Sequence, residues 1–291
     1  MLADQDRYQV IENIKKALKN QDFYAKVELN DPSLSDSEIA DIVHSYLENH
    51  NRIGFQLKSK LADMMVSCAT FFINRHTKLV GIEKVEGLSG GAIITSNHFS
   101  PLENTVVRRF VNTAFGRKLS IVSQATNFAM DGLVGYLMNY ADTIPISGDY
   151  RYLNHEFLSL LREKTDQGKM VLIYPEQEMW FNYRKPRPPK RGAYYFAAKL
   201  NLPVVSCFVE IVDGEENPKG DFNKVQYVLH TLGVLYPDAS KSVRENSIQM
   251  CEADYALKKE TYERIYGEPL LYDFKQTDIA GWKGVKQDER T

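Results

Sequence analysis

The sequence predicts an α/β fold in which a mixed, largely parallel central sheet is flanked by helices and preceded by an N-terminal helical section. From about residue 77 onward, short apolar segments alternate with longer segments of helical periodicity, as in layered α/β proteins. The apolar segments 171–174 (VLIY) and 203–211 (PVVSCFVEI) are continuous, as expected for central strands covered on both faces. We therefore expect a helical section over residues 1–76 and an α/β domain over residues 77–291.

Three helices are expected in the N-terminal section. The first has Val10 and Ile14 at helical spacing, and the second begins at residues 35–38 (SDSE), which have the pattern of a capping box. The third, over residues 55–75, has its apolar residues mainly on one face. That stripe can form the core of a helical bundle, or it can lie in a membrane interface, as amphipathic helices with aromatic residues do. The stripe consists of Leu57, Leu61, Met64, Met65, Cys68, Phe71 and Phe72.

The elements of the α/β domain follow from the period of the apolar residues and from the turn residues between segments. The expected strands are 79–87, 91–97, 118–124, 142–147, 169–175, 203–211 and 225–232, and the expected helices are 101–115, 128–140, 151–167, 192–200 and 246–266.

Composition limits the class of protein. The chain has 291 residues, of which 43% are hydrophobic and 25% charged, which is ordinary for a globular protein. Its formal net charge of -2 argues against a nucleic-acid-binding surface, so any basic site must be local. The longest apolar stretch, residues 64–73, is shorter than the ~18–20 residues that cross a bilayer.

The cysteines and the N-terminal sequence indicate a compartment. The three cysteines are odd in number and lack CxxC spacing, which argues against a disulfide framework and a structural zinc site. Residues 1–10 lack the apolar core of a secretory signal. We therefore expect a cytoplasmic protein.

The segment 97–103 (NHFSPLE) contains the residues best suited to chemistry. His98 lies on the turn between an expected strand and an expected helix, in which Ser100 would be the N-cap and Pro101 the first helical residue. Glu103 would lie in the first helical turn, from which its carboxylate can reach back to the imidazole. A carboxylate bonded to one ring nitrogen fixes the tautomer and leaves the other nitrogen free to accept a proton. His98 is therefore a candidate general base with Glu103 as its partner.

Both residues also have a structural interpretation. His98 by itself could cap a helix or lie in the core, and Glu103 could close a capping box by bonding to the Ser100 N–H. Because a carboxylate has two oxygens, that bond does not exclude a contact with His98. No metal site is expected, since the other histidines lack paired ligand spacing: His44, His50, His76, His155 and His230.

Four motifs, in order and spacing, resemble those of the glycerol-phosphate and lysophosphatidic-acid acyltransferases. That family has NHxxxxD at such a turn, which matches residues 97–103 with a glutamate in place of the aspartate. Residues 171–176 (VLIYPE) resemble the family's strand ending in FPEG. Residues 190–199 (KRGAYYFAAK) resemble its Lys-Gly-Ala helix, and residues 202–205 (LPVV) resemble its final proline motif.

The resemblance covers about residues 79–235 and implies an enzyme that moves a fatty acyl group. The donor would be acyl-CoA or acyl carrier protein, and the acceptor a hydroxyl of a lysophospholipid or glycerolipid. The catalytic residues would be His98 and Glu103, and neither a metal nor a further cofactor is implied. Because the product is a lipid, peripheral contact with the inner face of the membrane is also expected. The residues with an implied part in substrate binding are Asn97, Glu176, Gln177, Lys190 and Arg191.

The sequence departs from the family where the acceptor phosphate is bound. The family's FPEGTR is replaced by residues 174–179 (YPEQEM), which lack the glycine and the arginine. Residues 142–148 (DTIPISG) come nearest to the family's second, glycine-rich motif and also lack its arginine. A second hypothesis is therefore an acceptor without glycerol phosphate, such as an amine, an amino acid, a sugar or a hydroxylated lipid. A third is a non-catalytic lipid-binding relative.

Residues 176–191 leave alternatives open. Glu176 can place the acceptor or be a solvated loop acid, and residues 179–181 (MWF) can line an acyl groove or pack the loop. The basic residues among the prolines can hold the phosphates of CoA, an acidic carrier protein or an anionic lipid surface, or they can be solvated. These basic residues are Arg184, Lys185, Arg187, Lys190 and Arg191.

Overall fold

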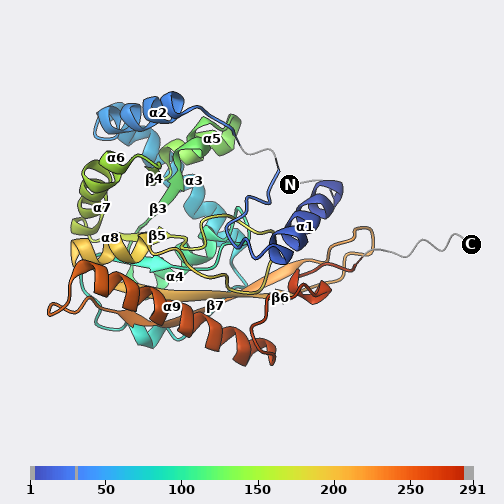
Figure 1. Ribbon diagram of the computed structural model, residues 1–291. Helices are drawn as coiled ribbons and strands as arrows, with labels where there is room; N and C mark the ends of the chain where they lie inside the picture. The colour runs from blue at the N-terminus through green and yellow to red at the C-terminus, as the bar shows by residue number, and fades with distance from the viewer. Residues whose placement is uncertain (1–3, 30–31, 285–291) are drawn as a thin grey trace, which may run out of the picture.

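One seven-stranded sheet forms the centre of the part of the chain that the structure, a computed structural model, describes: residues 4–29 and 32–284 (Figure 1). The strands lie in the order β1-β7-β6-β2-β5-β3-β4, and all neighbouring pairs are parallel except β6 and β7. The strands are β1 (Lys78–Val80), β2 (Ala92–Thr95), β3 (Leu119–Gln124), β4 (Thr143–Ile146), β5 (Met170–Ile173), β6 (Val204–Asp213) and β7 (Val225–Leu235). The predicted mixed, largely parallel sheet is confirmed.

Helices lie on both faces of this sheet, and three of them precede the first strand, as predicted. Helices α7, α8 and α9 cover one face and α4 covers the other. The α-helices are α1 (Asp4–Lys19), α2 (Asp36–Asn49), α3 (Ile53–Ile73), α4 (Asn104–Phe115), α5 (Gly132–Tyr140), α6 (Tyr150–Asn154), α7 (Glu156–Asp166), α8 (Gly192–Leu200) and α9 (Val243–Tyr266). The 3-10 helices are η1 (Ile82–Val85), η2 (Ala125–Ala129) and η3 (Gln276–Asp278).

The core explains the continuous apolar strands. In β5, Val171 and Ile173 join the cluster beneath α7 and α8, whereas Met170 and Leu172 join the cluster beneath α4. Successive side chains of a strand point to opposite faces, so a strand covered on both faces needs apolar residues at every position.

Several element boundaries differ from those expected. The strand expected over residues 79–87 ends at Val80, because Gly81 turns the chain at φ +78° into η1, and a Cβ there would lie 2.6 Å from the Thr231 carbonyl oxygen. The helix expected over residues 151–167 is divided at His155 into α6 and α7. The helix expected from Pro101 begins at Asn104.

The N-terminal section shares its packing with the C-terminal part of the chain. Apolar residues of α1, including Val10 and Ile14, form one cluster with Trp180 and Ile279. The indole N–H of Trp180 also donates to the Ala25 carbonyl at 3.0 Å. The segment after α1 therefore lies against the loop that contains Trp180, and a domain boundary at residue 76 stays a prediction.

Helix α3 points its apolar stripe outward. Leu57 is 61% exposed, Met64 64% and Phe71 70%, whereas Ala62 is the buried residue of this helix. The stripe is thus not the core of a bundle, which was one of its two interpretations. Among the described residues, no helix is both long enough and apolar enough to cross a membrane.

Candidate active site

The Asn97 side chain anchors the turn after β2 to the neighbouring strand β6. This side chain is 2% exposed, and its amide donates to the Val209 carbonyl at 3.0 Å and accepts from the Val209 N–H at 2.8 Å. Because β2 pairs with β6 in parallel, the amide continues that pairing past the end of the strand. The Asn97 side chain thus positions the residue that follows it, His98, and its expected part in substrate binding stays a prediction.

His98 and Glu103 form the contact that their spacing suggested. The Nδ1 atom of His98 lies 2.5 Å from Oε1 of Glu103, and the Glu103 side chain is 1% exposed while that of His98 is 20% exposed. The other oxygen, Oε2, accepts the Ser100 N–H. One carboxylate therefore serves both the turn and the imidazole.

The cap of α4 differs from the expectation. Glu103 is the N-cap residue, with no side-chain capping bond, and residues 100–103 form a turn before the helix. Ser100 and Pro101 thus do not serve as N-cap and first helical residue. The Glu103 carboxylate bonds back to Ser100 from the end of this turn, so the helix begins only after Glu103.

The hydrogen bond to Glu103 determines what His98 can do. An ionised carboxylate only accepts, so the proton of a neutral imidazole lies on Nδ1 and Nε2 keeps its lone pair. Within the described residues, Nε2 has no protein partner. The ring also stacks on Tyr174, with centroids 4.1 Å apart and planes 8° from parallel. The arrangement can accept a proton at Nε2.

Glu176 is buried and bonded by the protein itself. It is 3% exposed, and Oε2 accepts the His98 N–H at 3.3 Å while Oε1 accepts the Arg187 N–H at 3.0 Å. The Arg187 guanidinium bonds Oε2 and the carbonyls of Phe23 and Glu178. Burial lowers the pKa of Arg187, and the nearby Glu176 carboxylate acts in the opposite direction. Glu176 is therefore not a solvated acid, and it links the loop to the backbone of His98.

Most basic residues of the segment 184–191 neither are solvated nor stand ready to bind an anionic substrate, because they form ion pairs within the protein. Arg187 pairs with Glu176, Lys185 lies 2.8 Å from Asp278, and Arg184 lies 2.5 Å from Asp213. Lys185 and Arg187 are each 1% exposed. Lys185 and Arg184 thus fasten the loop to Asp278 in η3 and to Asp213 at the end of β6, whereas Arg187 pairs within the loop. The acidic partners 213 and 278 are distant in sequence, so no local signal identifies them.

Lys190 and Arg191 are the exposed residues of the run. The Lys190 ammonium lies 3.7 Å from the centroid of the Tyr24 ring, a cation–π contact at the start of α8. These two charges can still meet an anionic substrate.

Gln177 occupies a tight turn. It is exposed and has φ +65°, a left-handed conformation in which glycine is favoured, and it stands where the resemblance has glycine. The next residue, Glu178, accepts a hydrogen bond of 3.0 Å from Gln124 at the end of β3. This part of the edge is therefore polar and acidic, without the arginine of the related motif.

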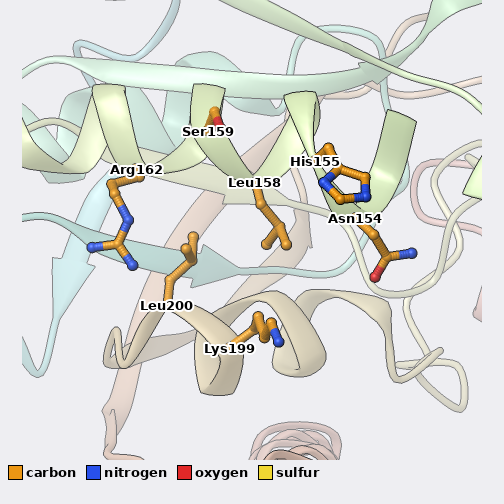
Figure 2. Close-up of a pocket in the computed structure, with 7 residues that line it drawn as sticks. All are labelled: Asn154, His155, Leu158, Ser159, Arg162, Lys199 and Leu200. Carbon is orange, nitrogen blue, oxygen red and sulfur yellow. The ribbon is translucent and has the colours of Figure 1, made fainter. Parts of the chain in front are cut away.

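A recess between α7 and α8 lies apart from these residues (Figure 2). It contains Arg162, Lys199 and His155 over a floor of Leu158 and Leu200, and neither His98 nor Glu103 lines it. In the described part of the chain, no cluster of three His, Cys, Asp or Glu side chains could hold a metal ion.

One comparison with known proteins, the match to a family model, agrees with the resemblance. Residues 74–210 match the family model described as Acyltransferase. No curated protein matches the chain. Among solved structures, the chain is similar to the crystal structure of the 1-acyl-sn-glycerophosphate (LPA) acyltransferase, PlsC, from Thermotoga maritima. The two are 13% identical, with a TM-score of 0.49, and the match covers 90% of this chain and 97% of that chain. The matched residues include β2, the His98 turn and β5, so residues 74–210 form an acyltransferase domain and the chain is an acyltransferase.

Proposed function

We propose that this enzyme transfers a fatty acyl group from acyl-CoA or acyl carrier protein to a hydroxyl of a lysophospholipid or glycerolipid, with His98 as general base. The observation that carries the proposal is the His98–Glu103 pair, in which a buried carboxylate holds Nδ1 and leaves Nε2 without a protein partner in the described residues.

The chemistry needs no group beyond the two substrates. Nε2 of His98 accepts the proton of the acceptor hydroxyl while its oxygen attacks the thioester carbonyl carbon. The C–S bond then breaks, the new ester forms, and the imidazolium returns the proton to the departing sulfur. Glu103 stabilises the imidazolium while it exists, because its carboxylate accepts the Nδ1–H. General-base assistance of this kind contributes about 10²- to 10⁴-fold in rate.

The test is acceptor-dependent thiol release from long-chain acyl-CoA and acyl carrier protein, with mass detection of the product. His98→Ala should lose about 10²- to 10⁴-fold of this activity while its Tm stays close to that of the wild type. His44→Ala is the matched control, since His44 on α2 has a 73% exposed side chain and should retain full activity.

Two outcomes would oppose the proposal. A large fall in the Tm of His98→Ala would mean that His98 is structural. A folded wild type that binds acyl chains but releases no thiol with any donor would favour the non-catalytic lipid-binding alternative.

A second acceptor class is favoured by the charges of the loop. Arg184, Lys185 and Arg187 are engaged with carboxylates of the protein, and Glu178 lies at the sheet edge where the related motif has arginine nearby. An acceptor without a phosphate, such as an amine, an amino acid, a sugar or a hydroxylated lipid, suits this edge better. Running the same assay with lysophosphatidate, lysophosphatidylcholine and phosphate-free acceptors side by side separates the two classes by kcat/KM.

We further propose that α3 contacts the cytoplasmic face of a membrane. Helix α5, which packs against α3, also exposes the apolar residues Leu133 and Val134. Exposed basic residues accompany the stripe: Arg52 precedes it, Lys60 lies between Leu57 and Leu61 in the sequence, and Arg75 follows it. Apolar surface between cations suits an anionic bilayer surface, at which each Lys or Arg contributes ~1 kcal/mol.

Sedimentation with anionic phosphatidylglycerol vesicles tests this contact. Leu57→Glu with Phe71→Glu should weaken vesicle binding about 100-fold, since each substitution removes ~1.4 kcal/mol or more of apolar transfer. The matched control is Tyr236→Glu with Leu271→Glu, because these residues are 64% and 54% exposed outside α3 and α5. Equal binding by both double variants would exclude α3 as the membrane contact.

A further inference from the structure

The ring of Tyr174 covers one face of the His98 imidazole. Their centroids are 4.1 Å apart and their planes differ by 8°, which is close to parallel. Tyr174 directly follows β5, and β5 pairs with β2, the strand that leads to His98. Two neighbouring parallel strands therefore bring the two rings together at the same edge of the sheet.

The hydroxyl of Tyr174 lies in a buried site. Among the described residues it makes no hydrogen bond of ordinary geometry. Burial raises the pKa of Tyr174 well above its ordinary value, and the nearby Glu103 carboxylate raises it further. The phenol therefore stays neutral, and the contact with His98 is made by an uncharged aromatic ring.

We propose that the ring of Tyr174 is a positioning element for His98, which holds the plane of the imidazole so that Nε2 faces the acceptor. The inference rests on the proposed function of His98 as base. It concerns the aromatic ring. The hydroxyl makes no hydrogen bond of ordinary geometry in the described residues, and the Tyr174→Phe variant separates any interaction of the hydroxyl with the nearby Glu103 carboxylate from the effect of the ring.

Two constraints are needed because one hydrogen bond leaves a ring free to tilt. Glu103 fixes the direction of Nδ1, but the imidazole can still rotate about the Nδ1···Oε1 line. A parallel ring at 4.1 Å blocks that rotation on one side. When His98 becomes protonated during the reaction, the aromatic face also attracts the positive ring. Both effects act on the reaction step and leave the binding of substrate unchanged.

The test compares Tyr174→Phe with Tyr174→Leu. The phenylalanine variant keeps the stacked ring and should retain at least about half of the wild-type kcat, whereas the leucine variant should lose about tenfold or more in kcat with KM changed less than about twofold. Full kcat in Tyr174→Leu would overturn the proposal, as would an equal loss in both variants.

A spectroscopic measurement tests the same contact without turnover. A stacked ring moves the carbon-bound proton signals of His98 upfield by its ring current, and these signals are identified by their absence in His98→Ala. They should stay upfield in Tyr174→Phe and move downfield in Tyr174→Leu. Unmoved signals in Tyr174→Leu would exclude the stack, even if no acceptor had been found and the proposed function had failed.

A control separates positioning from general loss of packing. Tyr152 on α6 is 6% exposed and contacts Phe157. Tyr152→Leu should lower the Tm at least as much as Tyr174→Leu but leave the His98 signals in place. A shift of these signals in Tyr152→Leu would attribute the effect to packing and contradict the positioning role.

Discussion

The turn 96–103 and the loop 176–191 follow adjacent parallel strands, β2 and β5, yet they use charge in opposite ways. In the turn, one buried carboxylate converges on one imidazole, whose second nitrogen has no protein partner in the described residues. In the loop, Arg187, Lys185 and Arg184 each form an ion pair with a carboxylate of the same chain. The catalytic candidate is therefore distinguished from the structural charged residues by its burial and by its hydrogen-bond partners more than by its residue type.

The two regions are also joined. Glu176 of the loop accepts the backbone N–H of His98, so the loop charges hold the turn in place without contacting its side chains. Breaking the loop pair should then affect stability first, whereas breaking the turn pair should affect catalysis first.

The largest expected effect comes from the loop. Arg187→Met leaves the buried Glu176 carboxylate without its guanidinium and should lower the free energy of unfolding by about 3–5 kcal/mol, measured by urea denaturation. The control is Lys224→Met, which removes the exposed pair with Glu215 and should cost less than about 1 kcal/mol. Equal losses for the two pairs would show that burial does not distinguish them.

The next effect lies in the turn. Glu103→Gln keeps the size of the side chain but can present an amide N–H to Nδ1, which favours the tautomer with the proton on Nε2. We expect kcat to fall about 100-fold with little change in KM or Tm, since the base is then blocked in the ground state. Glu103→Asp keeps the charge and should retain activity. Inactivity of both variants with unchanged stability would mean that the length of Glu103 matters as much as its charge.

Sequence predicts the turn better than the loop because the interactions of the turn are local. His98 and Glu103 are five residues apart at a strand-to-helix junction, and their contact follows from that spacing. Lys185 bonds Asp278, which is 93 residues away in the sequence, and neither apolar periodicity nor a motif predicts such a pair. The layered fold was predictable for the same reason as the turn, since apolar periodicity is read within each segment. The sequence left two interpretations of the apolar stripe of α3, a bundle core or a membrane interface, because an apolar stripe alone does not identify the surface that covers it.

A smaller effect is expected at the exposed end of the loop. Lys190→Ala with Arg191→Ala should raise KM for acyl-CoA by about three- to tenfold and leave kcat unchanged, since exposed charges contribute ~1 kcal/mol or less to an ionic contact. The increase should shrink at high salt. Arg162→Ala with Lys199→Ala, in the recess of Figure 2, is the control and should leave KM unchanged. A KM raised equally by both double variants would point to overall charge rather than to a site.

The smallest effect concerns the backbone of the loop. Gln177 has φ +65°, where a side chain costs ~1 kcal/mol that glycine avoids, while glycine adds ~0.5–1 kcal/mol of unfolded-chain entropy. Gln177→Gly should therefore leave the free energy of unfolding unchanged or raise it by up to ~0.5 kcal/mol. The control is Gln167→Gly. At φ -73° a side chain costs no strain that glycine could remove, so this substitution should lower the free energy of unfolding by about 0.5–1 kcal/mol. If Gln177→Gly keeps its stability but raises KM for the acceptor, the side chain contacts substrate, as the resemblance implied. If KM is unchanged, position 177 serves only the turn that brings Glu176 to His98.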